Sequence, residues 1–60
     1  MNKLKFYRLK CGLSQTELAK CVGIKIGRYS HYETGRRELP VVIAKEIGKV
    51  LQVDWWKLYE

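Results

Sequence analysis

The chain has 60 residues, enough for one domain but not for a second lobe, a deep substrate cleft or a cofactor-binding fold. We therefore expect residues 1–60 to form a single domain with a compact core. Apolar runs fall well short of the roughly 20 residues that span a membrane, and the chain does not open with a signal peptide. These features favour a cytoplasmic protein without a membrane partner.

The formal net charge is +6, and it is unevenly placed along the chain. Residues 1–37 hold nine Lys and Arg against two Glu, a balance of +7, whereas residues 38–60 hold three Lys against four Asp and Glu, a balance of −1. A positive segment of this kind suggests a polyanionic partner. On charge alone, a generally basic domain without such a partner is an equally good interpretation.

The reactive side chains point to neither an enzyme, a metal site nor a cofactor. Cys11 and Cys21 are too few for a disulfide scaffold, and we expect both to be reduced thiols. His31 is the only histidine, so a zinc site would need carboxylates from elsewhere in the chain. An enzyme would need a nucleophile, a base and a pocket, and the sequence offers no such set. We predict no catalytic residue and no small-molecule ligand.

The first expected helix spans residues 2–11, with Asn2 as its cap and Gly12 as its stop. Four of its residues share one face at helical spacing: Leu4, Tyr7, Arg8 and Cys11. Phe6 and Leu9 lie off that face, an unusual place for two large apolar side chains.

The second expected helix has the clearest start signal in the chain. Ser14 and Glu17 fit a capping box, in which the Ser hydroxyl accepts the Glu backbone N–H and the Glu carboxylate reaches back. The helix ends at Gly23 after barely two turns, and its buried face is formed by Leu18, Ala19 and Val22. A helix this short is not stable alone, so tertiary packing must hold it.

A tight turn over residues 23–25 leads into a third expected helix, residues 26–34. Tyr29 and Tyr32 are three residues apart, so both point inward, and Gly35 is the natural left-handed terminator. The positions left facing outward are Lys25, Ile26, Gly27, Arg28, Ser30 and His31.

The remaining residues predict a fourth helix and a short fifth one. Pro40 fits the first position of the fourth helix, whose core stripe is Ile43, Ile47, Val50 and Leu51. Gly48 inside that helix costs about 1 kcal/mol relative to Ala, so we interpret it as a place where another helix approaches closely. Asp54 is expected to cap a last helix that carries Trp55, Trp56 and Leu58. The predicted fold is all-α, a compact bundle of four to five short helices.

Two short helices joined by a Gly-containing turn, the second with an outward polar face, form the helix-turn-helix layout. Three runs carry a closer likeness: GLSQTELAKCVGI at residues 12–24, YSHYETGRR at residues 29–37 and IGKVLQV at residues 47–53. Through them the chain closely resembles the phage Cro and repressor proteins and their XRE-like bacterial relatives over nearly its whole length. The resemblance implies a lambda-repressor-like fold and a sequence-specific transcriptional regulator of double-stranded DNA, most simply a repressor.

The resemblance also implies roles for single residues. The helix over residues 26–34 would lie in the major groove, with the second helix across the backbone. The family positions that read base edges match Lys25, Ile26, Gly27, Arg28, Ser30 and His31. Phosphate contacts would come from Gln15 and Thr16 at the start of the second helix and from Arg36 and Arg37 in the loop after the third. The plainer interpretation of each is an ordinary solvated surface residue.

The start of the expected recognition helix departs from the family pattern, which often places small or amide residues there. Ile26 can contact a thymine methyl group, and Arg28 can make a bidentate contact to guanine. Gly27 has no side chain with which to read a base. Either the backbone approaches the duplex at this residue, or specificity rests more on Arg28 and His31.

Arg8 and Glu33 match two family positions that hold an ion pair between the first and third helices. Arg8 lies on the inward face of its helix, where an unpaired charge is costly. Such a pair acts indirectly, by fixing the recognition helix against its scaffold. The alternative is two unrelated surface charges.

A homodimer on a pseudo-palindromic operator is expected, because a 60-residue unit offers few phosphate contacts and most of the resembled family bind DNA as dimers. The core of so small a domain cannot hide all of its large apolar side chains. We expect some of the following to cover the core and others to form a dimer patch: Phe6, Leu9, Trp55, Trp56 and Tyr59. Two rivals stay open. One is an antitoxin-like or adaptor module that uses the same fold to bind protein, and the other is the DNA-binding fragment of a longer repressor.

Overall fold

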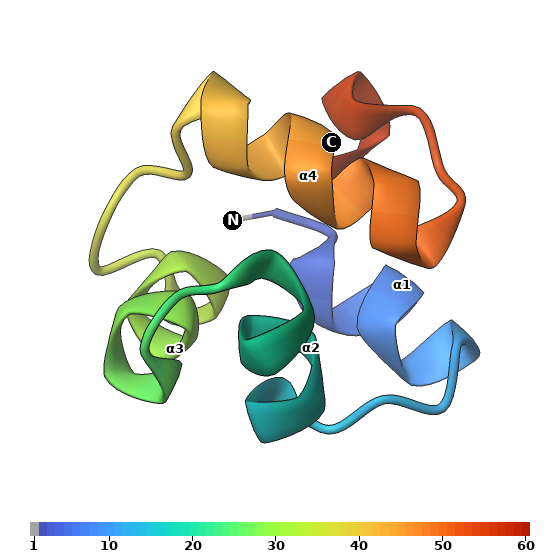
Figure 1. Ribbon diagram of the computed structural model, residues 1–60. Helices are drawn as coiled ribbons and strands as arrows, with labels where there is room; N and C mark the ends of the chain where they lie inside the picture. Colours follow the sequence, from blue (N-terminus) through green and yellow to red (C-terminus); the bar gives the residue numbers. More distant parts are fainter. Residues whose placement is uncertain (1) are drawn as a thin grey trace.

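The computed structural model describes residues 2–60, and in this part of the chain every regular element is helical (Figure 1). The α-helices are α1 (Leu4–Lys10), α2 (Gln15–Val22), α3 (Ile26–Thr34) and α4 (Val41–Leu51), and a short 3₁₀ helix, η1 (Trp55–Tyr59), follows. This arrangement confirms the all-α bundle of short helices that the sequence predicts.

One hydrophobic core joins all five elements. Helix α4 packs against both α2 and η1, α2 packs against α3, and α1 lies against η1. None of these helices is long enough to persist alone, so the shared core stabilises each of them. The buried apolar residues come from every helix and from the loop before α4: Leu4, Leu18, Ala19, Tyr29, Tyr32, Leu39, Ala44, Ile47, Leu51 and Leu58.

The predicted boundaries of α2 and α3 are those of the structure, because their end signals are local. The Ser14 hydroxyl accepts the Glu17 backbone N–H at 3.0 Å, and the Glu17 carboxylate accepts the Ser14 N–H at 2.8 Å. The hydrogen bond from the Ser14 backbone holds the pKa of Glu17 below its ordinary value. Gly23 and Gly35 end the two helices with φ of +74° and +82°, a conformation that favours glycine.

Other expected boundaries are wrong. Helix α1 is shorter than the expected 2–11, because it begins at Leu4 and ends at Lys10. The Leu4 N–H donates to the Asn2 side chain at 3.0 Å, as expected for a cap. Pro40 lies at the cap position, with extended ψ of 146°, so α4 starts one residue later. Asp54 does occupy the expected N-cap position of η1, where its backbone carbonyl accepts the Lys57 N–H at 3.0 Å, but its side chain makes no capping hydrogen bond.

Gly48 explains how η1 fits onto α4. A Cβ atom at this position would lie 2.8 Å from the Val53 carbonyl oxygen and 3.3 Å from the Trp55 Cα. The expectation of close approach is therefore confirmed, although the neighbour is a turn and a 3₁₀ helix rather than an α-helix. The bare backbone of Gly48 lets the chain fold back and cover the core with Leu58.

Candidate nucleic-acid interface

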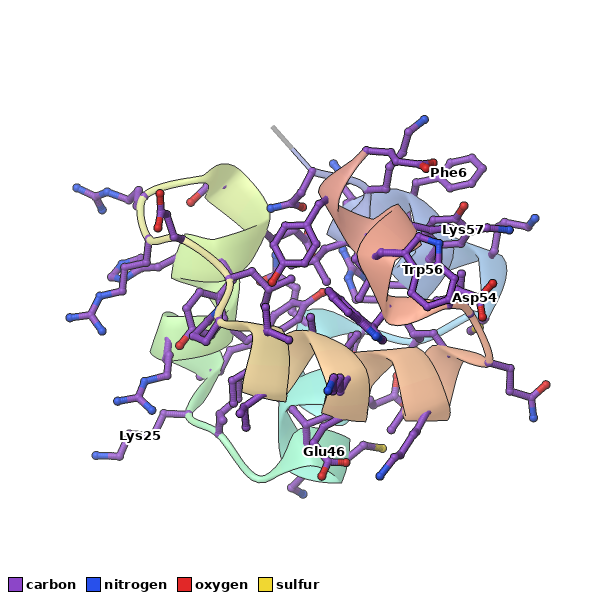
Figure 2. All side chains as sticks on the ribbon, turned by 90° about the horizontal axis from the view of Figure 1, so that it is seen from above. Phe6, Lys25, Glu46, Asp54, Trp56 and Lys57 are labelled. Carbon is purple, nitrogen blue, oxygen red and sulfur yellow. The ribbon has the colours of Figure 1, made fainter. Side chains whose placement is uncertain are left out.

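Helices α2 and α3 pack against each other across the turn at residues 23–25, and α3 lies at one side of the molecule (Figure 1). Lys25, Ile26, Gly27 and Arg28 are exposed at the start of α3. Figure 2 shows Lys25 projecting from the side of the molecule opposite to Phe6 and Trp56. The N-cap and first turn of α3 therefore present two cationic side chains and one apolar side chain to solvent.

The later outward positions of α3 are less open than the sequence pattern predicts. Ser30 and His31 are half-buried. The Ser30 carbonyl accepts a hydrogen bond from the Thr34 hydroxyl at 3.1 Å. An open hollow of about 680 Å³ lies instead beside the preceding turn and the first turn of α3, where it is lined by residues 23–28. The most accessible part of α3 is thus its N-terminal end.

The inner side of α3 is fixed by an ion pair between Arg8 of α1 and Glu33. Arg8 Nε donates to Glu33 Oε2 at 2.9 Å, and Arg8 Nη2 donates to Oε1 at 3.0 Å. The two side chains are only 8% and 5% exposed. Arg8 Nη1 also donates to the Leu13 carbonyl at 2.7 Å. This bidentate geometry restrains α3 in both position and rotation relative to α1.

Two further donors complete the environment of Glu33. The Tyr29 hydroxyl donates to Oε2 at 2.7 Å, and Gln15 Nε2 donates to Oε1 at 3.0 Å. Burial opposes ionisation of Glu33, but the hydrogen bonds from Arg8, Tyr29 and Gln15 outweigh it and lower the pKa of this carboxyl. The hydrogen bond to Glu33 raises the pKa of Arg8, and burial raises that of Tyr29. The site therefore holds a carboxylate, a guanidinium and a neutral phenol.

The hydrogen bonds of Tyr29 and Gln15 in this cluster were not predicted from the sequence. Tyr29 lies four residues before Glu33 on the same helix, a spacing that places the two side chains together and could have indicated the contact. Gln15 comes from another helix, and no local spacing connects it to Glu33. One amide hydrogen of Gln15 is engaged with Glu33, which leaves its second hydrogen for another acceptor.

The remaining expected contact residues lie at two other places around α3. Thr16 is exposed in the first turn of α2. Arg36 and Arg37 are exposed in the loop between α3 and α4, where the Arg37 backbone N–H donates to the His31 carbonyl at 3.1 Å. The structure thus brings Arg8, Glu33 and Gln15 into contact and leaves the other residues along an accessible surface.

Within residues 2–60, groups of three or more His, Cys, Asp or Glu side chains that could hold a metal ion do not occur. Cys11 and Cys21 are free and exposed. None of the helices in this part of the chain is long and apolar enough to cross a membrane.

The helix-turn-helix family model matches residues 4–55, nearly the whole chain, so the protein belongs to the helix-turn-helix family. The chain is similar to the uncharacterized HTH-type transcriptional regulator YqaF of Bacillus subtilis (strain 168). The two are 39% identical over 57 residues, a match that covers 95% of this chain and 75% of that protein. No solved structure gives a significant match.

Proposed function

We propose that this DNA-binding transcriptional regulator is a repressor that places α3 in the major groove of double-stranded DNA, with α2 across the backbone. The observation that carries the proposal is the pairing of two features on one helix. The outer side of α3 begins with exposed Lys25 and Arg28, and its inner side is fixed by the buried ion pair of Arg8 with Glu33. A recognition helix needs both an accessible side and a fixed orientation.

Base contacts are proposed for the exposed start of α3. Arg28 reaches guanine with a bidentate contact, and Ile26 packs on a thymine methyl group. No atom lies within 4 Å of the place where Gly27 would carry a Cβ, so open space there allows the backbone to approach the duplex. Lys25, Ser30 and His31 flank this centre, with Ser30 and His31 contributing less because they are half-buried.

Phosphate contacts are proposed on both sides of α3. Gln15 and Thr16 lie in the first turn of α2, where free backbone N–H groups and the helix dipole also favour an anion. Gln15 contacts phosphate with the amide hydrogen that Glu33 does not use. Arg36 and Arg37 reach the backbone from the loop after α3.

Residues 1–60 act as one DNA-binding domain, and two copies bind a pseudo-palindromic operator as a homodimer. One copy has few phosphate contacts, and a second copy doubles them. Large apolar side chains remain uncovered and supply material for an interface: Phe6, Leu9, Trp56 and Tyr59. Trp55 is not part of this set, because it is half-buried against the core.

Salt-dependent affinity tests this function. The affinity for a duplex selected from a random pool is expected to fall by orders of magnitude between low and physiological salt. The reason is that Lys and Arg side chains that contact phosphates release the counterions condensed on the DNA, and added salt opposes this release. Arg36→Ala and Arg37→Ala should each weaken binding to all sequences and reduce the slope of log affinity against log salt by about one per lost contact.

Lys57→Ala is the matched control for these two variants. Lys57 carries the same charge, and Figure 2 places it at the side of the molecule opposite to Lys25. Its loss should change the salt slope little. An affinity for duplex DNA that is insensitive to salt would contradict the proposal and favour an antitoxin-like or adaptor module that binds protein.

A further inference from the structure

The two ends of the described chain meet beside the loop of residues 35–40, which connects α3 to α4. In Figure 1 the N-terminal segment lies between α3 and α4, and η1 lies against α4. The Lys3 N–H donates to the Leu58 carbonyl at 2.8 Å, so the N-terminal segment and η1 are hydrogen-bonded to each other. The N-terminal segment also bonds to the last turn of α3, just before the loop, and η1 bonds to the loop near its end.

Asn2 holds the last turn of α3, which leads directly into the loop. Its Nδ2 donates to the Tyr32 carbonyl at 2.8 Å, a bond that joins residues thirty positions apart. The Tyr32 carbonyl belongs to the last turn of α3 and also accepts the Gly35 N–H at 3.3 Å, so Asn2 gives it a second hydrogen bond. The Oδ1 of the same side chain accepts the Leu4 N–H at 3.0 Å. One side chain therefore caps the end of α3 and the start of α1 together.

Tyr59 holds the other end of the loop. Its hydroxyl donates to the Leu39 carbonyl at 2.5 Å, and the Leu39 side chain is buried in the core. Burial and the nearby charge of Glu38 raise the pKa of Tyr59 above its ordinary value. The ring also packs edge-on against Trp55, which orients it.

Between these two anchors the loop has little support of its own. A hollow of about 400 Å³ lies beneath it, lined by Asn2, Gly35, Arg37, Glu38, Leu39 and Tyr59. The Arg37 N–H donates to the His31 carbonyl at 3.1 Å, but Arg36, Arg37 and Glu38 are all exposed. The path of the backbone through the two arginines is therefore set chiefly by where its ends are held.

We propose that Asn2 and Tyr59 are positioning residues for DNA binding: together they fix the loop so that Arg36 and Arg37 face the phosphate backbone. This inference rests on the proposed phosphate contacts of the two arginines. Neither positioning residue touches the duplex. Each lowers the cost of ordering two long cationic side chains on an exposed loop, since binding to a preorganised loop loses less conformational entropy.

Tyr59→Phe tests this role because it removes one oxygen atom and keeps the ring. The expected result is a threefold to tenfold loss of affinity for a duplex selected from a random pool, about the value of one hydrogen bond. The base preference of the protein should be unchanged, because α3 is held by other contacts. Tyr7→Phe is the matched control, because it removes a hydroxyl from a half-buried tyrosine of α1. It should leave affinity unchanged.

A double-mutant cycle separates positioning from general stability. In a background that carries Arg36→Ala and Arg37→Ala, Tyr59→Phe should have no further effect on affinity, because the side chains that it positions are gone. Hydrogen exchange should become faster in Tyr59→Phe at the Arg37 backbone amide, which donates to the His31 carbonyl, and stay unchanged in α1–α3. Full additivity in the cycle, or unchanged exchange in the loop, would overturn the proposal.

Two further outcomes keep the test decisive. If Tyr59→Phe lowers the melting temperature enough to obscure binding, Asn2→Ala is measured in the same cycle, and the same non-additivity is expected. If Arg36→Ala with Arg37→Ala does not weaken DNA binding in the wild-type background, the proposed phosphate contacts fail. A loss of affinity in Tyr59→Phe that persists in that case would show that Tyr59 does not act through the arginines.

Discussion

The two sides of α3 are built in opposite ways. On the inner side Tyr29 and Tyr32 are buried, and Glu33 accepts four hydrogen bonds from three different residues. On the outer side Ile26 is 44% exposed, and Gly27 and Arg28 are exposed with it. The charged Glu33 side chain is therefore buried on the side where apolar residues are usual, and the apolar Ile26 is exposed on the side where polar residues are usual.

This difference separates the two requirements of a helix that reads DNA. The inner side fixes the helix by directional hydrogen bonds, which restrain its rotation more closely than apolar packing does. The outer side stays without internal partners, so its side chains are available to a ligand. Substitutions on the inner side should therefore change stability, and substitutions at the start of the outer side should change DNA affinity alone.

The largest effect is expected from removing one member of the inner ion pair. Arg8→Ala leaves Glu33 buried without its cation, and Glu33→Ala leaves the guanidinium alone, so each should cost about 3–5 kcal/mol. Total stability for so small a domain lies near the low end of about 5–15 kcal/mol, so either variant should be largely unfolded at ambient temperature. Thermal unfolding measures this loss.

A double replacement of Arg8 and Glu33 by apolar residues should cost less than the sum of the single changes, because no unpaired charge remains. It should not reach wild-type stability, since the Tyr29 hydroxyl and the Leu13 carbonyl lose their partners. Two mild single variants with additive effects would show that the pair does not fix α3.

A smaller effect, and one of a different kind, is expected on the outer side. Arg28→Ala should leave the melting temperature unchanged and cost about 1–3 kcal/mol of binding free energy at one base pair of each half-site. Selection of binding sites by this variant should show relaxed preference at a symmetric pair of positions. Lower affinity with an unaltered preference would instead identify Arg28 as a phosphate contact.

The smallest effect is a dependence of stability on acid pH that comes from the inner side. Because the pKa of Glu33 is lowered in the folded state, its ionised form stabilises the protein above the unfolded carboxyl pKa of about 4.3. That contribution should be lost as pH falls through the folded pKa, which lies below this value. Melting temperatures from neutral to acid pH measure the loss.

Glu17 has a lowered pKa as well, so its capping box contributes to the same acid window. Glu17→Gln removes that contribution and is the control for Glu33. Acid sensitivity that persists in Glu17→Gln belongs to the rest of the molecule, with Glu33 as its expected main source. A melting temperature that stays constant through the acid range in this variant would contradict the assignment to Glu33.

Local signals in the sequence predicted the helix-turn-helix segment closely. Ser14, Glu17, Gly23 and Gly35 mark helix ends through bonds and backbone angles that involve residues a few positions apart. The signals at the two ends of the chain were weaker. The shorter α1 and the 3₁₀ geometry of η1 depend on how these segments fit against the rest of the fold.

The class of fold, the boundaries of α2 and α3, and the placement of positive charge in the first two-thirds of the chain could all be predicted from the amino-acid sequence. Helical periodicity, capping and charge are properties of neighbouring residues, so they can be identified without coordinates. The contact of Gln15 with Glu33, and the bonds of Asn2 and Tyr59 on either side of the loop after α3, depend on the packed fold. These hydrogen bonds join residues 18 to 30 positions apart, and a directional bond forms only when packing brings donor and acceptor within about 3 Å of each other.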